Sequence, residues 1–223
     1  MIENKGLFIA FEGIDGSGKT TQLKRFVEYL FYKDKHNHII LTREPYKETK
    51  IRKLLREGTD PLSQASLIAN LFINDRKQHV EELILPSLEK GFHVVTDRYK
   101  LSTIAYQSAQ GMDVAELIRK HVNLPVPNMT FIMDIPAKKA FARMSGESGR
   151  DPHKFESNIE FLEKIRKQFI QSQKSLPKER IFVINGDRDA EQIFNEIISI
   201  FEKEISNPPA KTSRSLFGIF RRY

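Results

Sequence analysis

Cysteine is absent from this chain. Without a thiol, the protein forms no disulfide bond, holds no thiolate-bound metal and uses no cysteine nucleophile. Long apolar runs are also absent, because none approaches the roughly 20 residues that a transmembrane helix needs. Residues 1–5 lead directly into a candidate strand, without the charged and apolar regions of a secretory signal. These absences predict a cytoplasmic protein with no membrane partner.

Positive charge is only slightly in excess over negative charge. The formal net charge is +7, from 36 Lys and Arg against 29 Asp and Glu. Four of the basic residues lie in a tail over 207–223 that contains no acid, which leaves +3 for residues 1–206. A charge of that size suits a cleft for anionic nucleotides as well as a polynucleotide surface, so it does not decide between them. We expect one domain over 1–206, followed by a basic C-terminal tail over 207–223 that begins near Pro208-Pro209.

A glycine-rich loop lies between an apolar run and the start of an amphipathic helix. Residues Gly13 to Thr20 fit the pattern G-x-x-x-x-G-K-[ST] of a phosphate-binding loop. Backbone N–H groups must turn inward around a phosphate, and side chains at the glycines would obstruct that approach. Lys19 would place its charge on the β- and γ-phosphates, and the Thr20 hydroxyl would bind Mg²⁺. The loop therefore predicts a site for a nucleoside triphosphate. Its expected ATP-binding residues are Gly13, Ile14, Asp15, Gly16, Ser17, Gly18, Lys19, Thr20 and Thr21.

Apolar runs of strand length alternate with segments of helical spacing. The expected strands are 7–11, 39–42, 92–96, 130–134 and 181–184. The first expected helix follows the phosphate loop and ends at about 33–37. A short helix over 51–55 and a longer helical region over 61–91 come next, and Pro86 should kink or divide the longer one. The remaining expected helices are 101–110, a short one that ends at Met144, 158–175 and one around 193–201. This alternation predicts an α/β protein, with a five-stranded parallel sheet flanked by helices in a three-layer P-loop NTPase fold. The polar segment at about 145–155 is expected to form a lid.

Asp97 closes the third apolar run, where a carboxylate helps to hold Mg²⁺ opposite the phosphate loop in such enzymes. A surface Asp at a strand end is also common, and we favour the metal role. The phosphate loop itself is shared by ATPases, GTPases, helicase-type motors and small-molecule kinases. The guanine-reading motif N-K-x-D is absent, and a motor normally needs a longer chain with further motifs. A small kinase is the remaining class.

Four stretches occur in the order and at the spacing of one kinase family. They are Phe11-Glu-Gly-Ile-Asp-Gly-Ser-Gly-Lys-Thr-Thr21, Thr42-Arg-Glu-Pro45, Leu71-Phe-Ile-Asn-Asp-Arg-Lys-Gln-His79 and Asp97-Arg-Tyr-Lys-Leu-Ser-Thr-Ile-Ala-Tyr-Gln107. Through them the chain resembles the thymidylate kinases of the nucleoside monophosphate kinase superfamily, over about residues 5–205. The resemblance implies a homodimeric enzyme of dTTP biosynthesis that transfers the γ-phosphoryl of Mg-ATP in line to dTMP, giving dTDP and ADP.

The resemblance also implies roles for individual residues. Phe72 would stack on thymine, and Arg76, one helical turn further along, would hydrogen-bond the base carbonyl edge. Arg43 and Arg98 would bind the 5′-phosphate of the acceptor, and Tyr106 would crowd the 2′ position of the sugar. The expected substrate-binding residues are Asp15, Arg43, Phe72, Arg76, Arg98, Thr103, Tyr106 and Gln107. The expected catalytic residues are Lys19, Asp97, Arg98 and Arg150, and the expected metal ligands are Thr20 and Asp97.

The sequence departs from the family pattern in two places. Tyr46-Lys47 replaces the glycine pair that usually follows Thr-Arg-Glu-Pro, which leaves the conformation of that loop open. The lid carries few arginines, so Arg150, and more remotely Arg143, are the candidates to reach the transferred phosphoryl group. Two alternatives stay open: a deoxynucleoside kinase, which needs a carboxylate base near an uncharged acceptor, and a nucleotide-binding regulatory or nucleic-acid-binding protein with the tail as a basic surface. We do not expect nucleic acid as a partner.

Overall fold

A single five-stranded parallel sheet forms the centre of the protein. The computed structural model describes residues 6–47, 51, 64–147 and 159–207. The strands are β1 (Phe8–Glu12), β2 (Ile39–Arg43), β3 (His93–Asp97), β4 (Met129–Asp134) and β5 (Ile181–Asn185), in the spatial order β2-β3-β1-β4-β5. All four neighbouring pairs run parallel. The expected parallel sheet is confirmed, with strand ends within one residue of the prediction.

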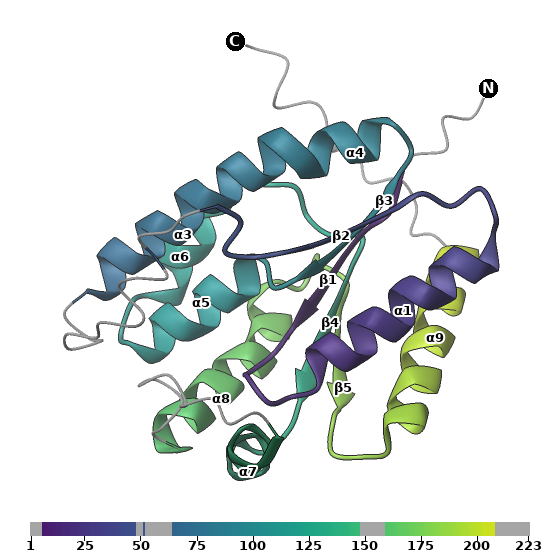
Figure 1. The fold of residues 1–223 in the computed structure, drawn as a ribbon. Helices are drawn as coiled ribbons and strands as arrows, with labels where there is room; N and C mark the ends of the chain where they lie inside the picture. Colours follow the sequence, from purple (N-terminus) through teal and green to yellow (C-terminus); the bar gives the residue numbers. More distant parts are fainter. Residues whose placement is uncertain (1–5, 48–50, 52–63, 148–158, 208–223) are drawn as a thin grey trace.

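Helices cover both faces of the sheet (Figure 1). They are α1 (Lys19–Lys33), α3 (Ala65–His79), the π-helix η1 (Val80–Ile84), α4 (Leu85–Glu89), α5 (Lys100–Ala109), α6 (Val114–Lys120), α7 (Ala137–Glu147), α8 (Ile159–Ser175) and α9 (Ala190–Ser206). Apolar residues of α1 and α9 pack on one face, against Phe11 and Phe131. Residues of α5 and α8 pack on the other around Ile132, while η1 and α4 cover Phe8 and Val94 on that same side. Side chains alternate between the two faces of a strand, so the apolar residues of β1 pack against the helices on both faces of the sheet.

The long helical region before β3 divides as the sequence predicts. The π-helix η1 separates α3 from α4, and Pro86 lies at the second position of α4. Proline removes one backbone donor and its ring collides with the carbonyl group four residues earlier, so a regular α-helix cannot continue through this position. The proposed start of the region at Pro61, the helix expected at 51–55 beyond residue 51, most of the lid and the tail from residue 208 lie outside the described residues.

Helix α6 is absent from the sequence-based prediction. The Asp113 carboxylate accepts a hydrogen bond from the Glu116 N–H at 2.7 Å and thereby caps the first turn of α6. Asp followed three residues later by Glu is a known signature of a helix start, so the signal was present in the sequence. The helix has seven residues, which is too short for a strong apolar period.

The sheet order brings distant parts of the sequence to one edge. β1 lies between β3 and β4, and β2 lies beyond β3. The carboxyl ends of parallel strands meet at the same edge of the sheet, which is where open α/β sheets bind ligands. The phosphate loop after β1, Asp97 at the end of β3 and Arg43 at the end of β2 are therefore neighbours.

Candidate active site

The phosphate loop connects β1 to α1, and its glycines are required by the protein around it. Gly13 and Gly16 have φ angles of 135° and 75°, which side chains rarely adopt. A Cβ atom at Gly13 would lie 2.6 Å from the carbonyl oxygen of Met133, and one at Gly16 would collide with the carbonyl oxygen of Ala140. The loop thus packs closely on β4 and α7, a reason for glycine in addition to the approach of a phosphate.

Lys19 is buried at the start of α1, beneath the loop. Its ammonium group donates to the Ile14 carbonyl oxygen at 2.8 Å and lies 3.6 Å from Asp15 Oδ1. Burial, followed by the charge of Arg98, lowers the pKa of Lys19. The lysine is therefore held at the phosphate loop, in an environment that favours partnership with an anion.

Thr20 and Asp97 come together from α1 and β3. The Thr20 hydroxyl donates to Asp97 Oδ2 at 3.3 Å, while the buried Oδ1 atom of Asp97 has no hydrogen-bond partner among the described residues. An unpartnered carboxylate oxygen beside a hydroxyl fits Mg²⁺, which takes few protein ligands and fills its octahedral shell with phosphate oxygens and water. No cluster of three or more His, Cys, Asp and Glu side chains suited to a metal occurs in the described part of the chain. The Thr20–Asp97 pair thus offers a place for Mg²⁺ only together with a phosphate ligand.

A cavity of about 390 Å³ opens beside this pair. Arg43, Pro45 and Tyr46 from the loop after β2 line it together with Thr20 and Asp97. Arg43 is exposed at the end of β2. The structure therefore brings Arg43 to the same cavity as the two candidate metal ligands.

Arg98 crosses from β3 to the phosphate loop. One guanidinium nitrogen, Nη1, donates to the Gly13 carbonyl oxygen at 3.2 Å, and Nη2 forms an ion pair with Asp15. The guanidinium also lies 5.4 Å from the centre of the Tyr106 ring, in the geometry of a cation–π contact. Asp15 of the phosphate-loop motif therefore lies beside Arg98, which in turn contacts Tyr106 of its own motif.

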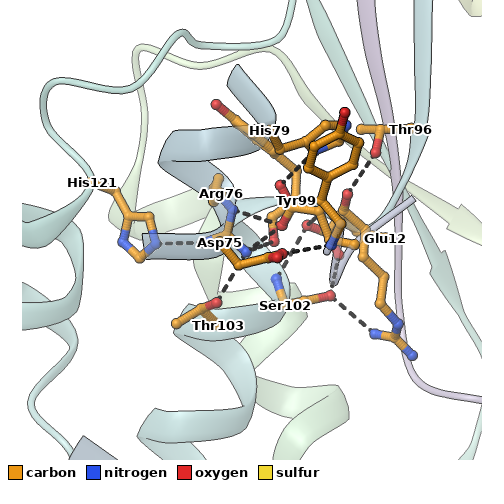
Figure 2. A network of polar contacts seen from close by, with 12 residues as sticks. Glu12, Asp75, Arg76, His79, Thr96, Tyr99, Ser102, Thr103 and His121 are labelled. Carbon is orange, nitrogen blue, oxygen red and sulfur yellow. Dashed lines mark hydrogen bonds and ion pairs between the residues drawn. The ribbon is translucent and has the colours of Figure 1, made fainter. Parts of the chain in front are cut away.

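Arg76 is held in a buried network between α3, α5 and α6 (Figure 2). Its guanidinium donates to Glu44 Oε2 at 2.7 Å, to the Tyr99 carbonyl oxygen at 3.0 Å and to Thr103 Oγ1 at 3.1 Å. Nη1 lies 2.8 Å from Nε2 of His121. Most of its donors are therefore occupied by the protein, and a base carbonyl would have to use the second hydrogen of Nη1, which no described residue accepts.

His121 contributes to the network as a neutral ring. Burial, followed by the charge of Arg76, lowers the pKa of His121 to about 3. Its Nδ1 lies 2.6 Å from the Leu117 carbonyl oxygen, so Nδ1 carries the proton and Nε2 accepts from Arg76. Neither Glu44 nor His121 was a predicted site residue.

The other predicted base contacts lie on α3 and α5. Phe72 is half-buried on α3, one turn before Arg76, and Thr103 and Gln107 are buried on α5. The Gln107 amide nitrogen donates to Gln110, and its buried amide oxygen has no partner among the described residues. An unpartnered buried oxygen is available to a donor on a ligand. The base-binding roles of these residues stay predictions.

The loop that carries Tyr46-Lys47 is anchored to α3. The two backbone N–H groups donate to the Asp75 carboxylate at 2.5 Å and 2.8 Å. The Tyr46 ring stacks on His79 with a centroid distance of 4.6 Å and an interplanar angle of 17°. Lys47 forms an ion pair with Glu82. These contacts set the loop conformation that the sequence left open. A glycine pair could make the two backbone hydrogen bonds to Asp75, but not the ring stacking or the ion pair.

Arg150 lies outside the described residues, whereas Arg143 lies on α7 beside the phosphate loop. Nη2 of Arg143 donates to the Gly186 carbonyl oxygen at 3.3 Å. Its Nη1 would be 3.9 Å from a Cβ atom placed at Gly18. The sequence treats Arg143 as the more remote candidate, but the structure places it next to the loop.

A P-loop nucleotide-binding protein is the class that this fold and site define, because the phosphate loop follows the central strand and Arg98, after the neighbouring strand β3, reaches it. A family model described as thymidylate kinase matches residues 11–197. The chain belongs to the thymidylate kinase family. No helix in the described ranges combines the length and apolarity needed to cross a bilayer.

Three relatives illustrate the similarity. The thymidylate kinase of Wolbachia pipientis subsp. Culex pipiens is 38% identical, over 89% of this chain and 97% of the relative. That of Thermosipho africanus is 36% identical, over 90% of this chain and all of the relative. That of Mycoplasma capricolum is 35% identical, over 93% of this chain and again the whole relative. Each of these similarities covers about nine tenths of this chain.

Proposed function

We propose that this kinase transfers the γ-phosphoryl group of Mg-ATP in line to the 5′-phosphate of dTMP, giving dTDP and ADP. The family assignment supports the substrates and the reaction. The convergence of Lys19, Arg98 and the Thr20–Asp97 pair at one edge of the sheet is the observation that carries the mechanism. The nucleophile is already an anionic phosphate oxygen, so the enzyme needs no strong base and acts by positioning and charge neutralisation.

On the donor side, the backbone N–H groups of the phosphate loop and the Lys19 ammonium bind the β- and γ-phosphates. Thr20 and Asp97 would hold Mg²⁺, which would supply charge neutralisation at the phosphate oxygens. The Lys19 ammonium donates to the Ile14 carbonyl oxygen at 2.8 Å, and it would exchange this partner for a phosphate oxygen. Arg143 and Arg150 are the candidates for further charge neutralisation from the lid side.

On the acceptor side, Arg43 and Arg98 bind the 5′-phosphate. Arg98 must then exchange Asp15 or the Gly13 carbonyl oxygen for the acceptor phosphate. Phe72 stacks on thymine, Arg76 reads its carbonyl edge, and Thr103 and Gln107 assist. Tyr106, next to Arg98 and Asp15, excludes a 2′-hydroxyl, while Asp15 faces the sugar 3′-OH or the metal.

A coupled assay of ADP release tests the proposed function. We expect Mg²⁺-dependent ADP release with dTMP, and little with thymidine or with no acceptor. Preferential release with thymidine would make the protein a deoxynucleoside kinase. Equal release with and without acceptors would indicate a nucleotide-binding ATPase. Sedimentation of the same sample tests the homodimer, and fractionation of cells tests the cytoplasmic location, both of which rest on the sequence and the family resemblance.

A further inference from the structure

Glu12 is a fully buried carboxylate at the end of the otherwise apolar strand β1. It accepts hydrogen bonds from the Tyr99 N–H at 2.9 Å, the Ser102 N–H at 3.1 Å and the Ser102 hydroxyl at 2.6 Å (Figure 2). These donors lie at the start of α5, far from Glu12 in the sequence. The side chain thus joins the strand that leads into the phosphate loop to the helix that carries Thr103, Tyr106 and Gln107.

Arg98 has an unusual backbone beside this carboxylate. Its φ angle is 74°, the only positive φ of a non-glycine residue in the described part of the chain. Such a conformation costs on the order of 1–3 kcal/mol and persists only where neighbouring contacts enforce it. The Arg98 N–H donates to the Phe11 carbonyl oxygen at 2.9 Å, and Thr96 Oγ1 donates to the Arg98 carbonyl oxygen at 2.9 Å. Glu12 fixes the next peptide through the Tyr99 N–H.

Glu12 also reaches the guanidinium of Arg98 through Ser102. The single hydroxyl hydrogen of Ser102 is directed to Glu12 Oε2, which leaves the lone pairs of Oγ for Nη1 of Arg98 at 3.0 Å. The carboxylate therefore determines which way the hydroxyl points. A guanidinium has no acceptor, so a hydroxyl that turned its hydrogen toward Arg98 would lose this contact.

Capping of α5 alone does not require a buried acid. Asp113 caps α6 with its carboxylate in an exposed position. Burial raises the pKa of Glu12 to about 7, although hydrogen bonds from Ser102 and the charge of Arg98 favour the ionised form. The position therefore retains a carboxylate at a cost in stability, as is common where a group serves a functional site.

We propose that Glu12 is a positioning residue for phosphoryl transfer, which holds Arg98 in its left-handed backbone conformation and, through Ser102, directs its guanidinium across the phosphate loop. The proposal rests on the function proposed for Arg98 in the previous section. Glu12 itself touches neither substrate, because its carboxylate is enclosed by β1, Tyr99 and Ser102.

The variants Glu12→Gln and Ser102→Ala test this relay. Glutamine keeps the volume and can still accept from the two N–H groups, but its amide nitrogen cannot accept from the Ser102 hydroxyl. We expect Glu12→Gln to lower kcat/KM for dTMP by about tenfold to a hundredfold, with KM for ATP changed by less than about threefold. Ser102→Ala should show a smaller loss of the same kind. The control Asp113→Asn, at a helix cap outside the site, should remain within about twofold of wild type.

A double-mutant cycle separates positioning from a general structural role. If Glu12 acts through Arg98, Glu12→Gln should cause little further loss in an Arg98→Ala background, where the guanidinium is already absent. An equal, multiplicative loss in both backgrounds would overturn the proposal, as would wild-type kinetics of the folded Glu12→Gln variant. If Glu12→Gln fails to fold, the same double-mutant cycle is measured with Ser102→Ala in place of Glu12→Gln, and the same two outcomes support or overturn the proposal. Absence of dTMP-dependent activity in wild type would refute the proposed function, whereas active wild type with unaffected variants would refute only the role of Glu12.

Discussion

The buried carboxylate of Glu12 makes a prediction about the pH dependence of folding. Its pKa is about 7 in the native protein, against an ordinary value of 4.5. Between these pH values the native state retains the proton and the unfolded state has lost it, so the free energy of unfolding falls as the pH rises. At about 1.36 kcal/mol for each pKa unit, the loss is roughly 3 kcal/mol, complete once the pH exceeds 7. Ionised Glu12 is therefore a destabilising group.

The assay is urea unfolding at several pH values for wild type and Glu12→Gln. Other titrating groups contribute equally to both proteins, so the difference between their free energies of unfolding isolates Glu12. The stability of wild type relative to the variant should fall by roughly 3 kcal/mol between pH 4.5 and pH 7, because the amide cannot ionise. A difference that is constant over this range would refute the reasoning, and a rising difference would mean that Arg98 and the hydrogen bonds outweigh burial.

Further variants test the remaining parts of the site. Arg76→Ala should weaken dTMP binding by roughly 1.5–3 kcal/mol, as measured by calorimetric titration. It should also lower the free energy of unfolding by about 3–5 kcal/mol in urea, because it leaves Glu44 buried without its cation. Unchanged stability would contradict the buried network. Tyr106→Ala should raise kcat/KM for ribothymidine monophosphate relative to dTMP, and an unchanged ratio in competition assays would remove Tyr106 as the sugar filter. Asp97→Asn should increase the Mg²⁺ concentration needed for half-maximal activity, whereas an unchanged Mg²⁺ titration would exclude Asp97 as a ligand.

Local sequence patterns predict the sheet and the phosphate loop well. Each strand is a short apolar run bounded by polar or glycine residues, and a parallel sheet buried on both faces requires such runs. The division of the long helix follows from one residue, Pro86, whose missing N–H acts within its own helix. These features depend on interactions between residues close in the sequence, so a single sequence contains the necessary information.

The partners of Arg76 and Arg98 depend on contacts between distant segments. Helical spacing places Phe72 and Arg76 one turn apart, but it does not show that Glu44 and His121 would surround the guanidinium. The contacts of Glu12 were missed for the same reason, because its donors lie more than 80 residues away in the sequence. A charged residue in a buried strand was the one available signal.

Anchoring of the Tyr46-Lys47 loop has a mechanical consequence. Asp75 binds the backbone of the loop, Tyr46 stacks on His79, and Glu44 is paired with Arg76. The last turn of α3, over residues 75–79, is thus fastened to the segment that carries Arg43. We therefore expect Arg43 to move together with α3, so that the groups proposed for the base and for the acceptor phosphate stay at a similar distance from each other. That distance is expected to favour nucleotides in which the base and the 5′-phosphate are separated by a matching length.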